Sequence, residues 1–299
     1  MPLRPPARVS AHSRDATRVG GVEALSLAVG DLVFDAVATG PADGRLVLLL
    51  HGFPQTSHSW RRVWPGLGWA GYRVVAPDQR GYSPGARPDG VDAYRMPELV
   101  ADVVGMLDAL GADQADVVGH DWGAAVAWQL AGRHAERVRT LTAVSVPHPL
   151  AFVEALRTDD DQRRRSLYMR DFGRPGYEHE LLADDAAGLR AVFDGGSGVD
   201  VEHVLARLGT PEVLRHCLDW YAAQTLEDAT GLGPVTAPTL HVWSDGDRAL
   251  GAAGAEATGR FVDGPYRFEV LRGVSHWVPE HAPDRLGSLL QEHLSTYPG

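Results

Sequence analysis

The sequence contains one cysteine, Cys217, among its 299 residues. A single cysteine excludes an internal disulfide and any metal site built from cysteine ligands. Cys217 falls within a helical pattern, so we expect a small, buried core residue there.

Positive charge is also scarce. The chain has 28 Lys and Arg residues against 39 Asp and Glu residues, which gives a net charge of −11. No basic run breaks this balance, and the charged stretch 157–166 (RTDDDQRRRS) mixes both signs. Nucleic acids and anionic membranes are therefore not expected as partners.

Long apolar runs are missing as well. No run approaches the roughly 20 residues that a membrane span requires, and residues 1–21 carry prolines and charges where a signal peptide needs an apolar stretch. We expect a cytoplasmic protein whose first residues, 1–22, are loose.

What the chain does contain is 44% hydrophobic residues, enough for the core of a large α/β domain. Residues 25–40 alternate around a Gly-Asp turn, which predicts an antiparallel hairpin at a sheet edge. Residues 46–52 and 73–78 are short, unalternating apolar runs, typical of parallel strands covered on both faces. Helix-length segments such as 97–112 lie between these runs, so the pattern predicts a mostly parallel, doubly wound sheet.

This alternation stops after Pro147 for about eighty residues, in which helical patterns occur without a convincing strand. It resumes with the predicted strand at 237–247. The pattern therefore predicts a core formed by 1–149 and 227–299, with a helical cap inserted at 150–226.

The stretch GHDWG (119–123) follows a predicted buried strand and opens a predicted helix. Glycines on both sides leave room for the strained backbone of a sharp strand-to-helix turn, whose apex projects from the carboxyl end of the sheet. The apex here is Asp121. The plainer alternative is that Asp121 only caps the helix.

Three further features fall at the same predicted edge. The segment HGFPQ ends an earlier strand, so that the backbone N–H groups of Phe53 and Trp122 could form a two-donor oxyanion hole. An acid follows a later strand, where Asp245 and Asp247 compete for the role. His276 follows the last strand, which completes the chain order of a nucleophile, acid and histidine triad.

On the motifs HGFP, GHDWG, SDGD and SHW, the chain resembles the epoxide hydrolase branch of the α/β hydrolases, whose nucleophile is an aspartate. The resemblance covers residues 25–296. It implies that Asp121 attacks the substrate, that His276 activates water, and that Asp247, at the family's acid position, supports His276 in preference to Asp245.

An aspartate suits this chemistry because it is already ionised at pH 7 and needs no base before it attacks an sp3 carbon. The product of that attack is an alkyl ester of Asp121. Water then hydrolyses the ester, with the oxyanion on the amides of Phe53 and Trp122. The expected substrates are a small apolar epoxide and water, and no metal ion or organic cofactor is expected.

The predicted cap contains two segments, 166–176 and 214–224, which resemble the family's two lid segments. Each family segment carries a ring-opening tyrosine, and these correspond to Tyr168 and Tyr221. Tyr221 also falls on the apolar face of its predicted helix. The alternative for each is a packing residue with its hydroxyl in water, and for Tyr177 we prefer that interpretation.

Two local features complete the expectations. The family implies a cis peptide between Phe53 and Pro54, although sequence alone makes trans the default. Asp78 and Arg80 are expected to hold a loop through an ion pair.

Two other functions remain open at this point. A haloalkane or haloacid dehalogenase uses the same nucleophile, and the Trp122 indole N–H could hold a halide. However, Phe53 stands where haloalkane dehalogenases carry an asparagine, and the arginines of fluoroacetate dehalogenases are missing near the elbow. A catalytically silent fold that binds a small ligand is the second alternative. The chain could also form a homodimer.

Overall fold

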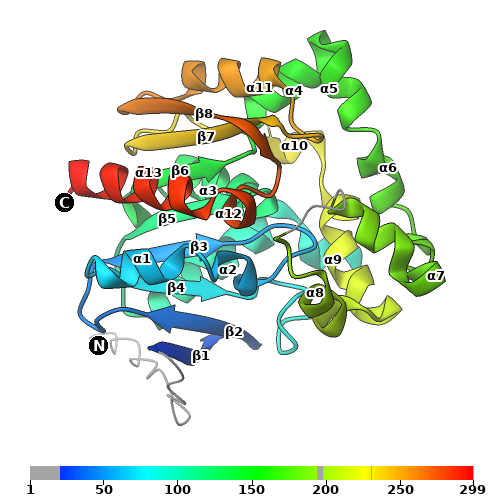
Figure 1. Ribbon diagram of the computed structural model, residues 1–299, viewed down its shortest axis with the longest axis horizontal. Helices are drawn as coiled ribbons and strands as arrows, with labels where there is room; N and C mark the ends of the chain where they lie inside the picture. Colours follow the sequence, from blue (N-terminus) through cyan, green and yellow to red (C-terminus); the bar gives the residue numbers. More distant parts are fainter. Residues whose placement is uncertain (1–20, 194–197, 230, 299) are drawn as a thin grey trace, which may run out of the picture.

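The computed structural model describes residues 21–193, 198–229 and 231–298. An eight-stranded sheet with the strand order β1-β2-β4-β3-β5-β6-β7-β8 runs through its centre (Figure 1). The strands are Val22–Val29 (β1), Leu32–Thr39 (β2), Leu46–Leu50 (β3), Arg73–Pro77 (β4), Ala115–His120 (β5), Val138–Val144 (β6), Thr239–Gly246 (β7) and Tyr266–Ser275 (β8). β2 pairs antiparallel with β1 and with β4, and the remaining pairs are parallel. The predicted edge hairpin and mostly parallel, doubly wound sheet are confirmed.

Helices cover both faces of the sheet. They are Trp64–Trp69 (α1), Met96–Ala109 (α2), Trp122–Arg133 (α3), Ala252–Ala257 (α11), Val278–His281 (α12) and Pro283–Thr296 (α13), with short 3-10 turns at Ser57–Trp60 (η1), Val91–Tyr94 (η2), Ala135–Arg137 (η3) and Thr258–Phe261 (η4). Successive residues of β3 serve opposite faces: Leu48 and Leu50 pack in the cluster that includes α2 and α3, and Val47 and Leu49 in the one that includes α1 and α13. This two-sided burial explains the unalternating apolar run.

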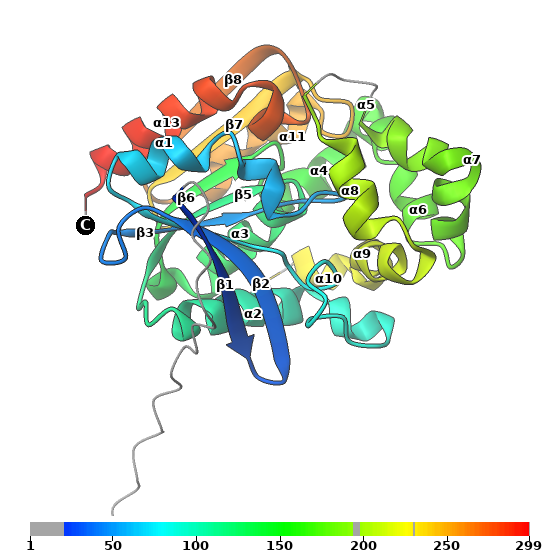
Figure 2. The ribbon, with the colours of Figure 1, turned by 60° about the horizontal axis from the view of Figure 1, so that its bottom comes forward.

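A group of helices follows β6 and precedes β7. They are Pro149–Thr158 (α4), Asp160–Arg165 (α5), Tyr168–Phe172 (α6), Tyr177–Val192 (α7), Val201–Leu208 (α8), Pro211–Ala223 (α9) and Leu226–Ala229 (α10). Figure 2 shows α6, α7, α8 and α9 gathered beyond one end of the sheet. The carboxyl ends of the parallel strands point toward this group of helices (Figure 1). The loops that follow those strands, where the sequence predicts the site residues, therefore lie next to the group.

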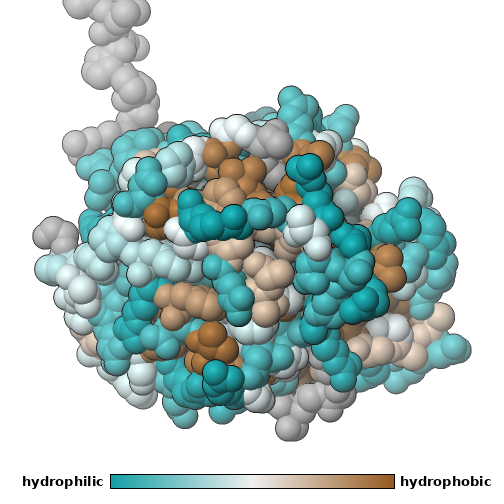
Figure 3. All heavy atoms as spheres, turned by 90° about the horizontal axis from the view of Figure 1, so that it is seen from above, coloured by the Kyte–Doolittle hydropathy of each residue, from teal (hydrophilic) through white to brown (hydrophobic). Residues whose placement is uncertain are grey.

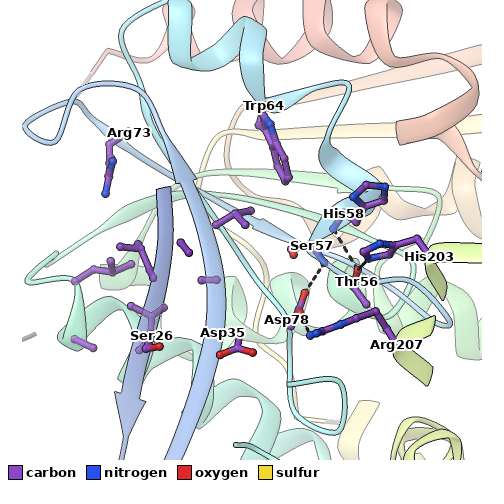
Figure 4. A pocket seen from close by; sticks show the side chains of 17 residues that line it. Ser26, Asp35, Thr56, Ser57, His58, Trp64, Arg73, Asp78, His203 and Arg207 are labelled. Atoms are coloured by element: carbon purple, nitrogen blue, oxygen red, sulfur yellow. Dashed lines mark hydrogen bonds and ion pairs between the residues drawn. The ribbon is translucent and has the colours of Figure 1, made fainter. Parts of the chain in front are cut away.

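Helix α8 meets the core through polar contacts, which Figure 4 shows at close range. Asp78 accepts hydrogen bonds from Arg207 of α8 at 2.9 Å and from the backbone N–H of Ser57 at 2.8 Å. Arg80 instead donates two parallel hydrogen bonds, both of 2.6 Å, to Asp102 of α2. The predicted Asp78–Arg80 ion pair is therefore wrong, because a helix carboxylate offers Arg80 a bidentate partner.

Three smaller expectations have different outcomes. Cys217 is fully buried, and the Phe53–Pro54 peptide is cis, as the family resemblance implied. The predicted loose start falls outside the described residues up to position 20. For residue 22, the last residue of that predicted segment, the prediction is wrong, because Val22 begins β1.

Within the described ranges, no helix is both long enough and apolar enough to cross a membrane. On the face seen in Figure 3, hydrophobic residues lie in small separate groups bordered by hydrophilic ones.

Candidate active site

Asp121 stands at the turn between β5 and α3 with φ 53° and ψ −123°, a backbone conformation that L-residues rarely adopt. Two glycines leave room for this turn. A Cβ on Gly119 would lie 2.2 Å from the carbonyl oxygen of Gly123, and a Cβ on Gly52 would lie 2.3 Å from the Cβ of Asp121. The strained turn therefore depends on glycine at these positions.

The Asp121 carboxylate lies among donors. Its side chain is buried, and Oδ1 accepts a hydrogen bond of 2.8 Å from the backbone N–H of Phe53. The Trp122 amide also hydrogen-bonds to it, whereas no side-chain capping bond to α3 is formed. Oδ2 lies 3.4 Å from Nε2 of His276. Burial alone would raise the pKa of Asp121, but His276 and the Trp122 amide outweigh it and lower that pKa below its usual range.

His276 follows β8 and touches two carboxylates. Its Nδ1 lies 2.7 Å from Oδ2 of Asp247, whose other oxygen accepts the backbone N–H groups of Ala249 and Leu250 at 2.8 and 2.9 Å. Asp245 is exposed and accepts the N–H of Gly273 at 2.6 Å instead. The structure thus brings Asp247, and not Asp245, to His276.

The two carboxylates set the charge of the histidine. Burial disfavours the imidazolium of His276, but Asp247 and Asp121 outweigh burial and raise the pKa of His276 to about 10. While Asp121 is ionised, His276 is therefore protonated at neutral pH.

Two residues outside the predicted triad hold the His276 backbone. Nε2 of His120 lies 2.9 Å from the carbonyl oxygen of His276, and the Ser145 hydroxyl donates to the same oxygen at 3.3 Å. Burial lowers the pKa of His120 to about 4, so its ring is neutral and Nε2 carries the donated proton. Ser145, at φ 72° after β6, has no signal in the sequence pattern that marks it.

Tyr168 of α6 and Tyr221 of α9 come from the helices above this edge. Their rings lie 6.2 Å apart, and both line cavities that Asp121 also lines. Burial and the nearby Asp121 charge raise the pKa of each phenol, so both hydroxyls are protonated donors. The Trp122 side chain hydrogen-bonds to Tyr221 and packs edge-on against its ring at 5.0 Å.

The cavity around these groups has two arms, which have Asp121, Tyr168 and Tyr221 in common. Arm A measures about 350 Å³ and is also lined by Met96, Trp122, Ala125, Gln129, Val146, Pro147, Pro149, Phe152, Val153, Leu156, Met169, Gln224, Thr225, Leu226, Asp228 and Leu250. Arm B measures about 430 Å³ and is also lined by Phe53, Phe172, Tyr177, Leu181, Gly188, Ala191, Val192, Arg248, Ala249, His276 and Trp277. A carboxylate, an imidazole and two phenols thus converge at the junction of two largely apolar arms.

A larger cavity of about 690 Å³ lies elsewhere, between β1, β2 and α8 (Figure 4). None of Asp121, Asp247 and His276 lines it. Convergence of reactive groups, and not cavity size, therefore identifies the candidate site.

Comparison with known proteins agrees with this arrangement. The sequence profile of the alpha/beta hydrolase fold matches residues 45–175. The chain is 32% identical to Epoxide hydrolase A of Mycobacterium tuberculosis, across 87% of this chain and 93% of the relative. It is also 32% identical to the AB hydrolase superfamily protein YfhM of Bacillus subtilis, across 92% and 98%. The crystal structure of Epoxide Hydrolase A from Mycobacterium thermoresistibile superposes with a TM-score of 0.79 at 30% identity, covering 92% of this chain and 98% of that one.

Proposed function

This chain belongs to the epoxide hydrolase family of the α/β hydrolases, and we propose that it converts an epoxide and water to a vicinal diol through an ester of Asp121. One observation carries the proposal: the ionised carboxylate of Asp121 faces the same cavity junction as two protonated phenols, Tyr168 and Tyr221. A nucleophile opposite two O–H donors suits an epoxide, whose leaving oxygen stays on the substrate and needs a proton.

In the first step, an oxygen of Asp121 attacks one epoxide carbon and the bond from that carbon to the ring oxygen breaks. Tyr168 and Tyr221 hydrogen-bond to the leaving oxygen, and one of them donates a proton. The pKa of both phenols is raised, which keeps the protons in place until the alkoxide forms.

Ester formation removes the negative charge of Asp121, one of the two charges that raise the pKa of His276. The pKa of His276 then falls, and the proton that it releases balances the one given by the phenol. Neutral His276, oriented by Asp247, can now take a proton from water as general base.

In the second step, that water attacks the carbonyl carbon of the Asp121 ester and gives one proton to His276. When the tetrahedral intermediate collapses, the bond from this carbon to the diol oxygen breaks, the diol oxygen takes the remaining proton of the water, and Asp121 returns as a carboxylate beside protonated His276. The oxyanion is stabilised by the backbone N–H groups of Phe53 and Trp122, each worth about 3 kcal/mol of barrier. The Phe53 N–H already donates to Asp121 in the free enzyme, so this donor is in place before reaction.

We propose that residues 150–226 act as a cap over a core of 1–149 and 227–299. The cap would supply Tyr168 and Tyr221, while the core supplies the nucleophile, acid and base. The enzyme would work in the cytoplasm, without a nucleic-acid or membrane partner. A homodimer stays a prediction, which sedimentation analysis at several concentrations would test.

The test is incubation with styrene oxide. We expect wild-type enzyme to form the diol and Asp121→Ala to retain less than a few per cent of that rate. One turnover in ¹⁸O water with enzyme in excess should give a diol whose new oxygen comes from the protein. Halide release from bromoalkanes without diol formation would favour a dehalogenase, and inertness toward both would favour a ligand-binding protein.

A further inference from the structure

The far end of arm A is polar, unlike the rest of that arm. Four polar residues lie there among apolar neighbours, namely Gln129, Gln224, Thr225 and Asp228. This polar end is separate from Asp121, His276 and the two tyrosines, and the proposed reaction does not use it. What it implies about the substrate rests on the proposed function.

Helix α3 sets the distance between this end and the reacting groups. Trp122, Ala125 and Gln129 line arm A at positions i, i+3 and i+7, which is one face of the helix. The helix rises 1.5 Å per residue, so Gln129 lies about 10 Å along the helix axis from Trp122. Trp122 is the residue next to the nucleophile, Asp121. A substrate arm of that length reaches the polar end when its epoxide lies at Asp121.

Two of the polar residues mainly build the wall. Gln129 donates to the carbonyl oxygen of Asp228 at 2.7 Å and accepts from Arg133 at 2.8 Å, so both ends of its amide are occupied. Thr225 donates to Oδ2 of Asp228 through its backbone N–H at 2.9 Å and its hydroxyl at 2.8 Å.

The remaining acceptors are less engaged. Gln224 donates through Nε2 to the carbonyl oxygen of Tyr94 at 3.1 Å, and among the described residues no donor reaches its Oε1. Within the part of the chain that the structure describes, Oδ1 of Asp228 has one long contact, 3.4 Å, to Arg95. The wall of arm A therefore presents acceptor oxygens that lack good donors from the protein.

We propose that arm A binds an epoxide substituent that ends in a hydroxyl group, which donates a hydrogen bond to Oε1 of Gln224. A hydroxyl suits the site better than an ammonium group, because Arg95 already places a positive charge beside Asp228. Gln224 is half-buried and Asp228 is buried, so an alkyl end would displace water from these acceptors without supplying a donor, which costs binding free energy.

Arm B suits the other, apolar substituent of the substrate. Apart from the groups at the junction and the Tyr177 hydroxyl, its lining is mainly apolar, with Arg248 at an exposed position. An internal epoxide would thus place its apolar substituent in arm B and its hydroxyl-bearing substituent in arm A.

The experiment compares two trans-disubstituted epoxides with the same short alkyl group on one carbon. The chain on the other carbon reaches about 10 Å and ends in a hydroxyl in one compound and in a methyl group in the other. We expect wild-type enzyme to favour the hydroxyl compound by at least about tenfold in kcat/KM. Equal kcat/KM values in the wild type would overturn the proposal, whatever the variants do.

Variants assign the preference to arm A. Gln224→Met keeps the length but removes the acceptor, and we expect the ratio of the two kcat/KM values to fall severalfold. Tyr177→Phe in arm B is the control and should keep the preference. An unchanged ratio in Gln224→Met, with folding checked by circular dichroism, would contradict the assignment. If neither compound nor styrene oxide is hydrolysed, the proposed function itself fails.

Discussion

At the residue scale, the site is governed by the charge of two carboxylates around one imidazole. Asp247 and Asp121 contact the two nitrogens of His276, at 2.7 and 3.4 Å, and together they raise its pKa to about 10. An ester at Asp121 would therefore change the proton affinity of His276. This electrostatic link makes two residue-scale predictions.

The first concerns the pKa of His276. Asp121→Asn removes one of the two negative charges, so we expect that pKa to fall below its wild-type value near 10. Titration of the imidazole nitrogens by NMR would measure it. Asp245→Asn is the matched control and should leave the titration unchanged, because Asp245 pairs with Gly273 instead. A wild-type value close to 6.5 would refute the electrostatic argument.

The second concerns Asp247. Replacing it with Asn leaves His276 without the carboxylate that orients it and stabilises its charge. We expect ester hydrolysis to slow by about 10³-fold or more, while attack by Asp121 continues. The alkylated enzyme should then accumulate and be visible by intact mass spectrometry. An adduct that never accumulates, with turnover unchanged, would remove Asp247 from the proposed triad.

The sequence indicated some of these residues more sharply than others. Gly119, Asp121 and Gly123 form a continuous motif, since the backbone strain of one turn is local. Asp245 and Asp247 are only two residues apart, and spacing could not distinguish them without the family resemblance. Ser145 and His120 act on His276 across more than 130 residues of chain, and no local pattern encodes such a contact.

At the element scale, the strands were predictable and the docking of helices was not. Strands that are buried on both faces produce apolar runs such as 46–52, which a hydrophobicity profile detects. The contact of α8 with the core depends on Arg207 reaching Asp78 across 129 positions. An ion pair between elements far apart in the chain produces no pattern in the sequence. The nearby Arg80 was therefore predicted as the partner of Asp78.

The elbow between β5 and α3 gives an element-scale prediction. In Gly119→Ala the new methyl group would lie 2.2 Å from the Gly123 carbonyl oxygen, a backbone atom that cannot move aside cheaply. We expect a loss of about 3 kcal/mol in the free energy of unfolding, measured with urea. Gly287→Ala in α13 is the matched control, since a Cβ there meets nothing within 4 Å and should stabilise by about 0.5–1 kcal/mol. A Gly119→Ala protein as stable as wild type would show that the elbow can relax.

At the scale of the whole molecule, buried histidines shape the dependence of stability on pH. Burial lowers the pKa of His120 and His148 to about 4 and that of His241 to about 3. A histidine whose pKa is depressed on folding stabilises the fold above 6.5 and loses that contribution as pH falls toward its folded value. His276 is the opposite case: its contribution is complete below 6.5 and is lost as pH rises through about 10.

These opposing effects predict a stability maximum near pH 6.5. Below it, protonation of each of the three buried histidines costs stability, and above it, deprotonation of His276 does so. Urea unfolding at pH 5, 6.5 and 8.5 would locate the maximum. A midpoint that rises steadily from pH 6.5 to pH 8.5 would contradict the assigned charge of His276.

The path of the chain between β6 and β7 has one more consequence. These strands are hydrogen-bonded neighbours, with Val144 opposite Val242, and the whole run of helices α4 to α10 leaves and re-enters the sheet at this one place. Tyr168 and Tyr221 belong to these helices, whereas Asp121, Asp247 and His276 lie outside them. A graft of the segment from a relative would exchange both proposed ring-opening tyrosines and most walls of both arms, and would leave the proposed nucleophile, acid and base unchanged.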